Sequence, residues 1–224
     1  MAHPFRSLPF IIHCSDWVIG IKKTLHADEQ EREDVKLKRE QWLSELPDLD
    51  PKHLVFIDES GAKTNMTRLR GRVKGGQRFF SSAPHGRWCT TTMISSIRLN
   101  GETATMEIGS ATDAMVFREY VRQILAPTLQ PKDIVVMDNL RAHYDAESIS
   151  LIEQTGASVK FLPPYSPDFN PIEKMWSKVK TLLRGYAART QSELSEAISA
   201  ALSAVTSMDA EGWFFSCGIT ASQS

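Results

Sequence analysis

The pattern of hydrophobic and polar positions changes its period part-way along the chain. The segment "HLVFIDES", which begins at residue 53, is a short apolar run with β-branched and aromatic residues and predicts a buried strand. Three more strands are predicted, at "MTRLRGRV", "RWCTTTMISSIRL" and "ETATMEIG", the last of them after the Asn100–Gly101 turn signal. From residue 112 onward, apolar residues recur at helical spacing, so the first helix of the main domain is expected there.

Strands and helices alternate in the second half. "DIVVMDN" and "SVKFLPP" are predicted strands, with a helix over "YDAESISLIEQTG" between them. A further helix is expected from Asn170 to about Gly185, and another begins at the capping box Thr190 to Glu193. This order predicts an α/β fold with one mixed sheet and helices on both faces. We expect "HLVFIDES" and "DIVVMDN" to be neighbours, with their carboxyl ends at the rim where open α/β sheets bind ligands.

A charged segment precedes this domain. Residues 1 to about 20 show no clear period and are expected to be poorly ordered. A linker helix is predicted from about Asp34, with Trp42 and Leu46 on one side of it. The chain is therefore divided into an N-terminal region with a linker helix, residues 1–50, and a single α/β domain, residues 51–224.

Composition excludes several classes of protein. With 224 residues and 42% hydrophobic content the chain can bury a sizeable core, and no apolar run approaches the length of a membrane span. The three cysteines lie far apart, which argues against structural zinc or a disulfide framework and favours a reducing compartment. No signal peptide is recognisable. We expect a cytoplasmic protein without a membrane segment.

The net charge of −1 hides a strongly basic stretch. From Ser60 to Gly101 there is no acidic residue, and eight Lys and Arg residues give +8. This segregation predicts an anionic partner, the alternative being an edge strand protected by charge. On a strand, Arg68, Arg70 and Arg72 would share one face. The residues predicted to contact phosphates are Arg68, Arg70, Arg72, Lys74 and Arg78, together with Lys174 and Lys178 on the helix after Asn170, although that helix face could also be simply solvated.

Two aspartates follow apolar strands. Asp58 comes after "HLVFI" and Asp138 after "IVVM". One such acid usually only begins a turn, but two on neighbouring strands repel each other unless a cation holds them or one is protonated. Oxygen ligands without a cysteine cluster suit Mg²⁺ or Mn²⁺ better than Zn²⁺. Glu59 points to the other side of the strand, so Asp58 is preferred as the ligand.

Glu173 has two interpretations. In "FLPPYSPDFNPIEKMW", Asn170 is a good N-cap, Pro171 suits the first helical position, and Glu173 falls at the third. A glutamate there is stabilised by the helix dipole whatever its function. Capping does not preclude ligation, however, because a carboxylate at that position is kept ionised and lies at the margin of the buried stripe.

Three segments together carry a family resemblance. "VFIDES", "VVMDNLRAH" and "LPPYSPDFNPIEKMW" resemble the catalytic blocks of bacterial insertion-sequence transposases of the mariner superfamily, members of the DDE group with a ribonuclease H-like fold. The resemblance extends from about Lys22 to Ile219, and the 34 residues between Asp138 and Glu173 match the spacing of that superfamily. The proline-rich block is its most specific part.

The resemblance implies a function and a set of site residues. Asp58, Asp138 and Glu173 would be the catalytic residues that bind two Mg²⁺ or Mn²⁺ ions, about 3.5–4 Å apart, for cleavage and strand transfer of DNA. Asn139 and His143 are characteristic neighbours in the second block, and Asn170 supports Glu173. For His143, a hydrogen bond at a helix start and the positioning of water are equally open. The implied partner is double-stranded DNA, both element ends and target, and a homodimer is expected when the protein is active.

The chain also departs from the family. Members carry N-terminal helix-turn-helix modules for element ends, and "MAHPFRSLPFIIHCSDW" cannot supply one. The chain therefore resembles a separated catalytic half, with the helix-turn-helix region fused or separately encoded, in the bacterial cytoplasm and on the nucleoid when bound to DNA. Two alternatives stay open. One is a catalytically idle fragment that regulates by binding DNA or by dimerising, and the other is a ribonuclease H-like nuclease.

Overall fold

A computed structural model of the protein describes residues 28–68, 78, 80, 82 and 84–220. The expectation of a poorly ordered start falls on residues outside this part. Within it, no helix combines the length and the apolar character that crossing a membrane requires.

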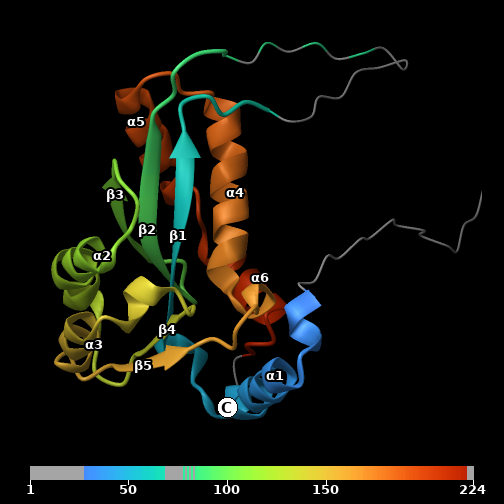
Figure 1. The fold of residues 1–224 in the computed structure, drawn as a ribbon, viewed down its shortest axis with the longest axis vertical. Coiled ribbons are helices and arrows are strands. Elements are labelled where there is room, and N and C mark those ends of the chain that lie inside the picture. Colours follow the sequence, from blue (N-terminus) through green and yellow to red (C-terminus); the bar gives the residue numbers. More distant parts are fainter. Residues whose placement is uncertain (1–27, 69–77, 79, 81, 83, 221–224) are drawn as a thin grey trace, which may run out of the picture.

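The described residues form one five-stranded mixed sheet (Figure 1). Its order is β3-β2-β1-β4-β5, in which β2 is antiparallel to both of its neighbours, β1 and β3, while β4 and β5 run parallel to β1. The neighbouring positions predicted for "HLVFIDES" and "DIVVMDN", which form β1 and β4, are therefore confirmed. The bounds are β1 Leu54–Lys63, β2 Thr90–Arg98, β3 Thr103–Ile108, β4 Ile134–Met137 and β5 Ser158–Phe161.

Helices cover both faces of this sheet. Alternate residues of each strand point to opposite sides, and the apolar side chains on each side form a separate hydrophobic cluster with the helices there. On one face, Val55 and Ile57 pack with α2 (Ala114–Tyr120) and α3 (Ala146–Glu153). On the other face, Leu54 and Phe56 pack with the remaining helices. Those helices are α1 Glu33–Glu45, α4 Pro171–Tyr186, α5 Gln191–Ser203 and α6 Ser207–Ser216. Trp42 of α1 and Leu46, which directly follows α1, belong to the same hydrophobic cluster.

Several predicted boundaries differ from the observed ones. β1 does not end at Asp58 but continues to Lys63, because β2 keeps hydrogen-bonding it after β4 has ended at Met137. The strand predicted over "MTRLRGRV" is absent from Met66–Arg68, and the rest of it lies outside the described residues. The helix predicted after residue 112 is α2 followed by a π-helical turn, Val121–Leu125.

The helices of the C-terminal third largely follow their sequence signals. The predicted capping box at the start of α5 is present, with Thr190 and Glu193 bonding each other's backbone. A second box, Thr206 with Asp209, begins α6 and was not predicted. α4 ends at Tyr186, one residue beyond the predicted end at about Gly185, and its C-cap residue Ala187 has the left-handed conformation. These local caps fix where each helix starts and stops.

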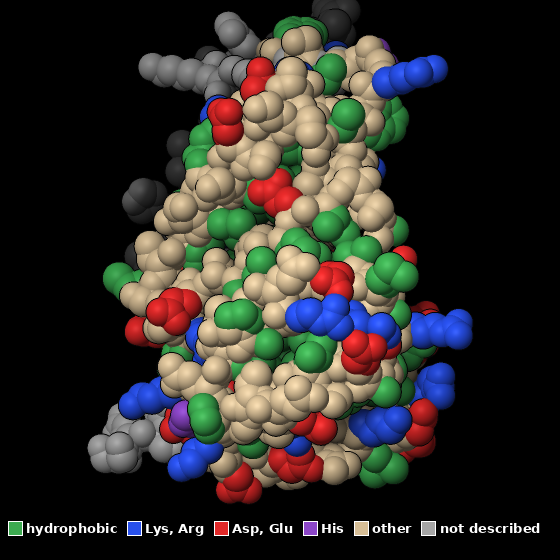
Figure 2. Space-filling model, turned by 90° about the vertical axis from the view of Figure 1, so that its left-hand side faces the viewer, with side chains coloured by type: hydrophobic (Ala, Val, Ile, Leu, Met, Phe, Trp, Pro, Cys, Tyr) green, Lys and Arg blue, Asp and Glu red, His purple; other side chains and the backbone are tan. Residues whose placement is uncertain are grey.

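Charges on the α2–α3 side are paired with one another. Arg118 forms ion pairs with Asp145 and Glu147, and Arg122 forms them with Glu119 and Glu147. Figure 2 shows this side, on which basic and acidic side chains lie next to one another over the lower half. The described residues of this face therefore form no surface of one sign for an anionic partner.

Candidate active site

Three carboxylates from separate elements line one cavity. It has a volume of about 450 Å³ and includes Asp58 of β1, Asp138 after β4 and Glu173 in the first turn of α4. The parallel register of β1 and β4 ends with Phe56 beside Val136, and the two aspartates each follow two residues later. α4 packs along β1, which brings Glu173 to the same place.

Asp58 lies on the α4 side of the sheet, as Phe56 does. Burial raises the pKa of the Asp58 carboxyl to about 8, and the negative charges of Glu173, Glu59 and Asp138 act in the same direction, against a backbone hydrogen bond. The aspartate is thus held in a place where a carboxylate is costly without a counter-charge. A cation in the cavity would supply that charge.

Asp138 is held by one of its two oxygens. Its Oδ1 accepts a hydrogen bond from the backbone N–H of Leu140 at 2.9 Å and lies 2.8 Å from Nδ1 of His143. Burial alone would raise the pKa of Asp138, but these two bonds outweigh it and hold the pKa below its usual value. The carboxylate is therefore ionised, and its Oδ2 remains available to the cavity.

His143 connects the two faces of the sheet. Its ring is fully buried against Phe117, with ring centroids 4.6 Å apart, and its Nε2 lies 3.0 Å from Oε1 of Glu59. Burial would lower the pKa of His143, but its bonds to Asp138 and Glu59 raise it to about 10. The doubly protonated ring then donates to both carboxylates. Glu59 does point away from Asp58, and it holds the histidine.

The two asparagines differ in what they do. Asn139 donates from Nδ2 to the Leu162 carbonyl at 2.7 Å and accepts from the Tyr144 hydroxyl at 2.6 Å, which joins the segments after β4 and β5. Asn170 stands at the N-cap of α4, but the expectation that its side chain caps the helix is wrong. Its Oδ1 is buried and has no hydrogen-bond partner. The Glu173 N–H bonds the Asn170 carbonyl instead.

An arginine of α1 clamps the proline-rich loop. Arg39 donates to Ser166 Oγ at 2.7 Å, grips both carboxylate oxygens of Asp168 at 3.0 and 2.7 Å, and lies 4.2 Å from the centre of the Phe169 ring. Sequence reasoning missed this clamp, because nothing local marks a contact between residues 129 positions apart. It fixes the loop that leads into Glu173.

The predicted phosphate contacts are only partly described. Lys178 bonds the Ala204 carbonyl at 2.7 Å and pairs with Asp209, while Lys174 donates to Cys217 Sγ at 3.2 Å. Both lysines therefore hold α6 and the chain after it against α4. Arg68 and Arg78 are exposed, and Arg68 borders an open groove with Arg184. The remaining three, Arg70, Arg72 and Lys74, lie outside the described residues.

The donors around the cavity suit a hard divalent cation. They are carboxylate oxygens, with the unpartnered Oδ1 of Asn170 next to them, and burial and the neighbouring carboxylates raise the pKa of Asp58. Among the described residues, no three His, Cys, Asp or Glu side chains are close enough to form a ready-made metal cluster. The residues that line the cavity are thus of the types that bind a divalent cation. They lie farther apart than the ligands of a fully formed metal site.

A comparison with protein families decides the affiliation. Residues 53–195, more than half of the chain, match the family model described as "DDE superfamily endonuclease". The chain belongs to this family. The matched region of the DDE superfamily endonuclease contains all three carboxylates and the whole sheet. No curated protein sequence matches the chain.

Solved structures share the fold of this DDE superfamily endonuclease. The catalytic domain of Mos1 mariner transposase superposes with a TM-score of 0.62 at 14% identity, over 88% of this chain and 92% of that one. The Mos1 paired-end complex with the left transposon end gives 0.64 at 16% identity, over 89% of this chain and 62% of the transposase. The Mos1 mariner paired-end complex with Mn gives 0.65 at 17%, over 90% and 64%.

These likenesses confirm the predicted ribonuclease H-like fold. The chain spans a little over three fifths of the length of the transposase in the paired-end complexes.

Proposed function

We propose that this DDE superfamily endonuclease is the catalytic part of a transposase, which cleaves DNA strands and joins the resulting 3′-hydroxyl to target DNA. The observation that carries the proposal is the meeting of Asp58, Asp138 and Glu173 at one cavity inside the region that matches the family. Support also comes from the Mos1 structures, which were solved with a transposon end and with Mg or Mn.

The three carboxylates would hold two Mg²⁺ or Mn²⁺ ions. When bound, such ions activate the attacking oxygen and stabilise the leaving oxygen of a phosphoryl displacement. The chain's own residues supply the arrangement around this chemistry. Asp138 offers Oδ2, since its Oδ1 is held by His143 and Leu140. Asp58 is fixed in the middle of a strand, and the Arg39 clamp fixes the approach to Glu173.

The partners of the reaction are proposed with it. We infer that the chain binds double-stranded DNA, works as a homodimer, and depends on a fused or separately encoded helix-turn-helix region to choose element ends. A bacterial insertion sequence, acting in the cytoplasm, is the proposed source. Phosphate contacts outside the cavity are assigned to Arg68, Arg70, Arg72, Lys74 and Arg78.

A nicking assay tests the function. Linear duplex DNA and an RNA–DNA hybrid are incubated with the chain and Mg²⁺ or Mn²⁺, with Asp138→Ala as the control. Metal-dependent nicking of the duplex that Asp138→Ala lacks supports the proposal. Cleavage of the hybrid alone would favour a ribonuclease H-like nuclease, and no cleavage by the parent chain, despite DNA binding, would favour a regulatory fragment.

A further inference from the structure

The catalytic cavity has an apolar wall that phosphoryl transfer does not use. Besides its carboxylates, the cavity is lined by Leu140, Leu162, Pro163, Pro164, Tyr165 and Pro167. Carboxylates and metal ions act on the phosphate and its oxygens, for which a hydrocarbon wall contributes nothing. The wall is therefore free to bind a flat, apolar part of the substrate that adjoins the phosphate.

Tyr165 is the most unusual residue of this wall. Its φ is +55°, in the left-handed region that residues other than Gly, Asn and Asp rarely adopt. Nevertheless its large side chain is 47% exposed, so it does not recover the cost by burial in the core. Strained backbone of this kind gathers at functional sites, where the surrounding structure imposes it.

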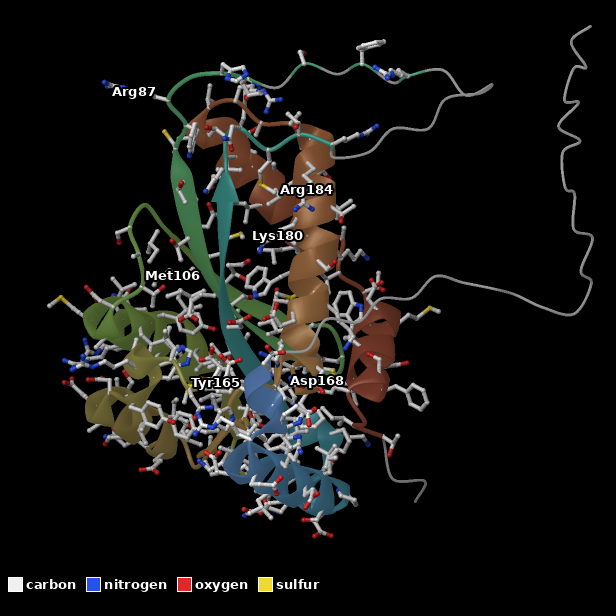
Figure 3. All side chains as sticks on the ribbon, turned by 45° about the vertical axis from the view of Figure 1, so that its right-hand side comes forward. Arg87, Met106, Tyr165, Asp168, Lys180 and Arg184 are labelled. Atoms are coloured by element: carbon white, nitrogen blue, oxygen red, sulfur yellow. The ribbon has the colours of Figure 1, made fainter. Side chains whose placement is uncertain are left out.

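The contacts around Tyr165 impose this conformation. Its carbonyl accepts a hydrogen bond from Gln30 at 2.5 Å. The next residue, Ser166, is gripped by Arg39 and donates to the Pro164 carbonyl at 3.0 Å. Figure 3 labels Tyr165 and Asp168 near the lower end of α4, next to α1. The loop is thus fixed on both sides of Tyr165, while the ring itself stays accessible.

A second part of the wall is also fixed in place. Leu140 lines the same cavity and is 42% exposed. It follows Asn139, whose amide joins the Leu162 carbonyl and the Tyr144 hydroxyl. Because these bonds hold the segment after β4 to the segment after β5, the apolar wall does not depend on a bound substrate for its shape.

We propose that Tyr165 is a base-stacking residue, whose ring receives the nucleobase next to the phosphate held at Asp58, Asp138 and Glu173, with Leu140 contacting the same base. The inference rests on the proposed function and adds how the DNA is gripped at the cavity. Stacking of a base on an aromatic ring tolerates any sequence. Tyr165 therefore holds a strand end in position without reading it.

The test is a cycle that removes the ring and the base separately. Duplex DNA carries an abasic nucleotide at each position of one strand end in turn, and its affinity is measured by fluorescence anisotropy with Ca²⁺. The proteins are the parent, Tyr165→Asn, Tyr165→Phe and the control Phe215→Ala, an exposed aromatic on α6. Asn tolerates the left-handed backbone, so the variant keeps the loop. Tyr165→Gly is the second ring-less variant should Tyr165→Asn fail to fold.

One abasic position should weaken binding by the parent, Tyr165→Phe and Phe215→Ala about tenfold, the range of one base–aromatic stack. Tyr165→Asn should bind intact DNA about tenfold more weakly than the parent does. Its affinity should not fall further when the base at that position is removed. Equal sensitivity of the parent and Tyr165→Asn at every position overturns the stacking role, while metal-dependent nicking by the parent would leave the proposed function intact. A parent chain that binds no DNA overturns both.

Discussion

The carboxylate of Glu59 lies 3.0 Å from Nε2 of His143, while Nδ1 of the same ring lies 2.8 Å from Asp138. Glu59 sits on the α2–α3 face of the sheet, and Asp138 opens into the cavity beside α4. A residue that cannot reach the cavity is therefore connected to it through one buried ring. Glu59 is a positioning residue for Asp138.

Loss of the Glu59 carboxylate should loosen Asp138. Glu59→Ala leaves Nε2 of His143 without its partner, which should lower the free energy of unfolding by roughly 1–3 kcal/mol and reduce nicking. Glu59→Gln should preserve most of both, because the amide oxygen can still accept the hydrogen bond. Urea denaturation and the nicking assay measure the two effects. Glu119→Ala, in an exposed pair, is the control, and a Glu59→Ala variant as stable and active as the parent would contradict the role.

The raised pKa of Asp58 predicts how stability depends on pH without metal. In the folded chain the pKa is about 8, above its ordinary value of 3.8, so the unfolded chain ionises first as the pH rises. The free energy of unfolding of the metal-free chain should therefore fall between about pH 4 and pH 8. Asp58→Asn should remove that part of the slope and be more stable than the parent at pH 8.

Divalent metal provides the check on this interpretation. Mn²⁺ at pH 8 should raise the melting temperature of the parent and have little effect on Asp58→Asn, because the variant has lost one of the proposed ligands. Thermal melts of both proteins, with and without Mn²⁺, across this pH range are the measurement. Parallel curves for the two metal-free proteins would show that Asp58 ionises normally.

Glu173→Gln separates helix capping from metal binding. The start of α4 has no capping box, unlike α5 and α6, so the change should cost only the dipole interaction, roughly 0.3–1 kcal/mol. If Glu173 holds metal, nicking should nonetheless collapse while the fold persists. Glu193→Gln is a matched control, because Glu193 occupies the same position in the first turn of α5. Near-normal nicking by Glu173→Gln would assign Glu173 to the helix alone.

Arg39→Ala should weaken the proline-rich loop. The change removes the two-oxygen grip on Asp168 and the contact with the Phe169 ring, and should destabilise the chain by about 1–3 kcal/mol. Arg39→Lys should recover only part, since lysine lacks the planar fork. Limited proteolysis within residues 162–170 reports the loosening. The control is Arg32→Ala, in an exposed pair with Asp34, which should change neither the stability nor the proteolysis of the loop. A loop that stays protected from proteolysis in Arg39→Ala would show that Arg39 does not fix it.

The basic stretch should appear in the salt dependence of DNA binding. Replacing Arg68, Arg70 and Arg72 by Ala should lower the slope of log affinity against log salt by about 3 if each contacts one phosphate. Binding measured over a range of NaCl concentrations gives the slope. Arg122→Ala, on the ion-paired α2–α3 side, is the control. An unchanged slope in the triple variant would show that these arginines do not contact phosphates, and would favour the alternative that the basic stretch protects the chain's own surface.

Sequence reasoning reached the elements whose signals are local. The strands that carry Asp58 and precede Asp138 followed from short apolar runs, and the box at Thr190 from a four-residue signature. What it missed depends on distant partners. The extension of β1 to Lys63 requires β2, and the Glu59–His143 bond joins residues 84 positions apart. The contacts of Lys174 and Lys178 with Cys217 and Asp209 were likewise not foreseen, because the sequence gives no sign that α6 packs on α4.

Arg39 also has a mechanical consequence. α1 is attached to the loop before α4 through a guanidinium that grips Asp168, and this loop ends one turn before Glu173. A twist of α1 would therefore act on Asp168 and, through it, on the start of α4. Torque applied to the chain ahead of α1 would be transmitted to one carboxylate of the cavity, while Asp58, anchored within the sheet, would stay where it is.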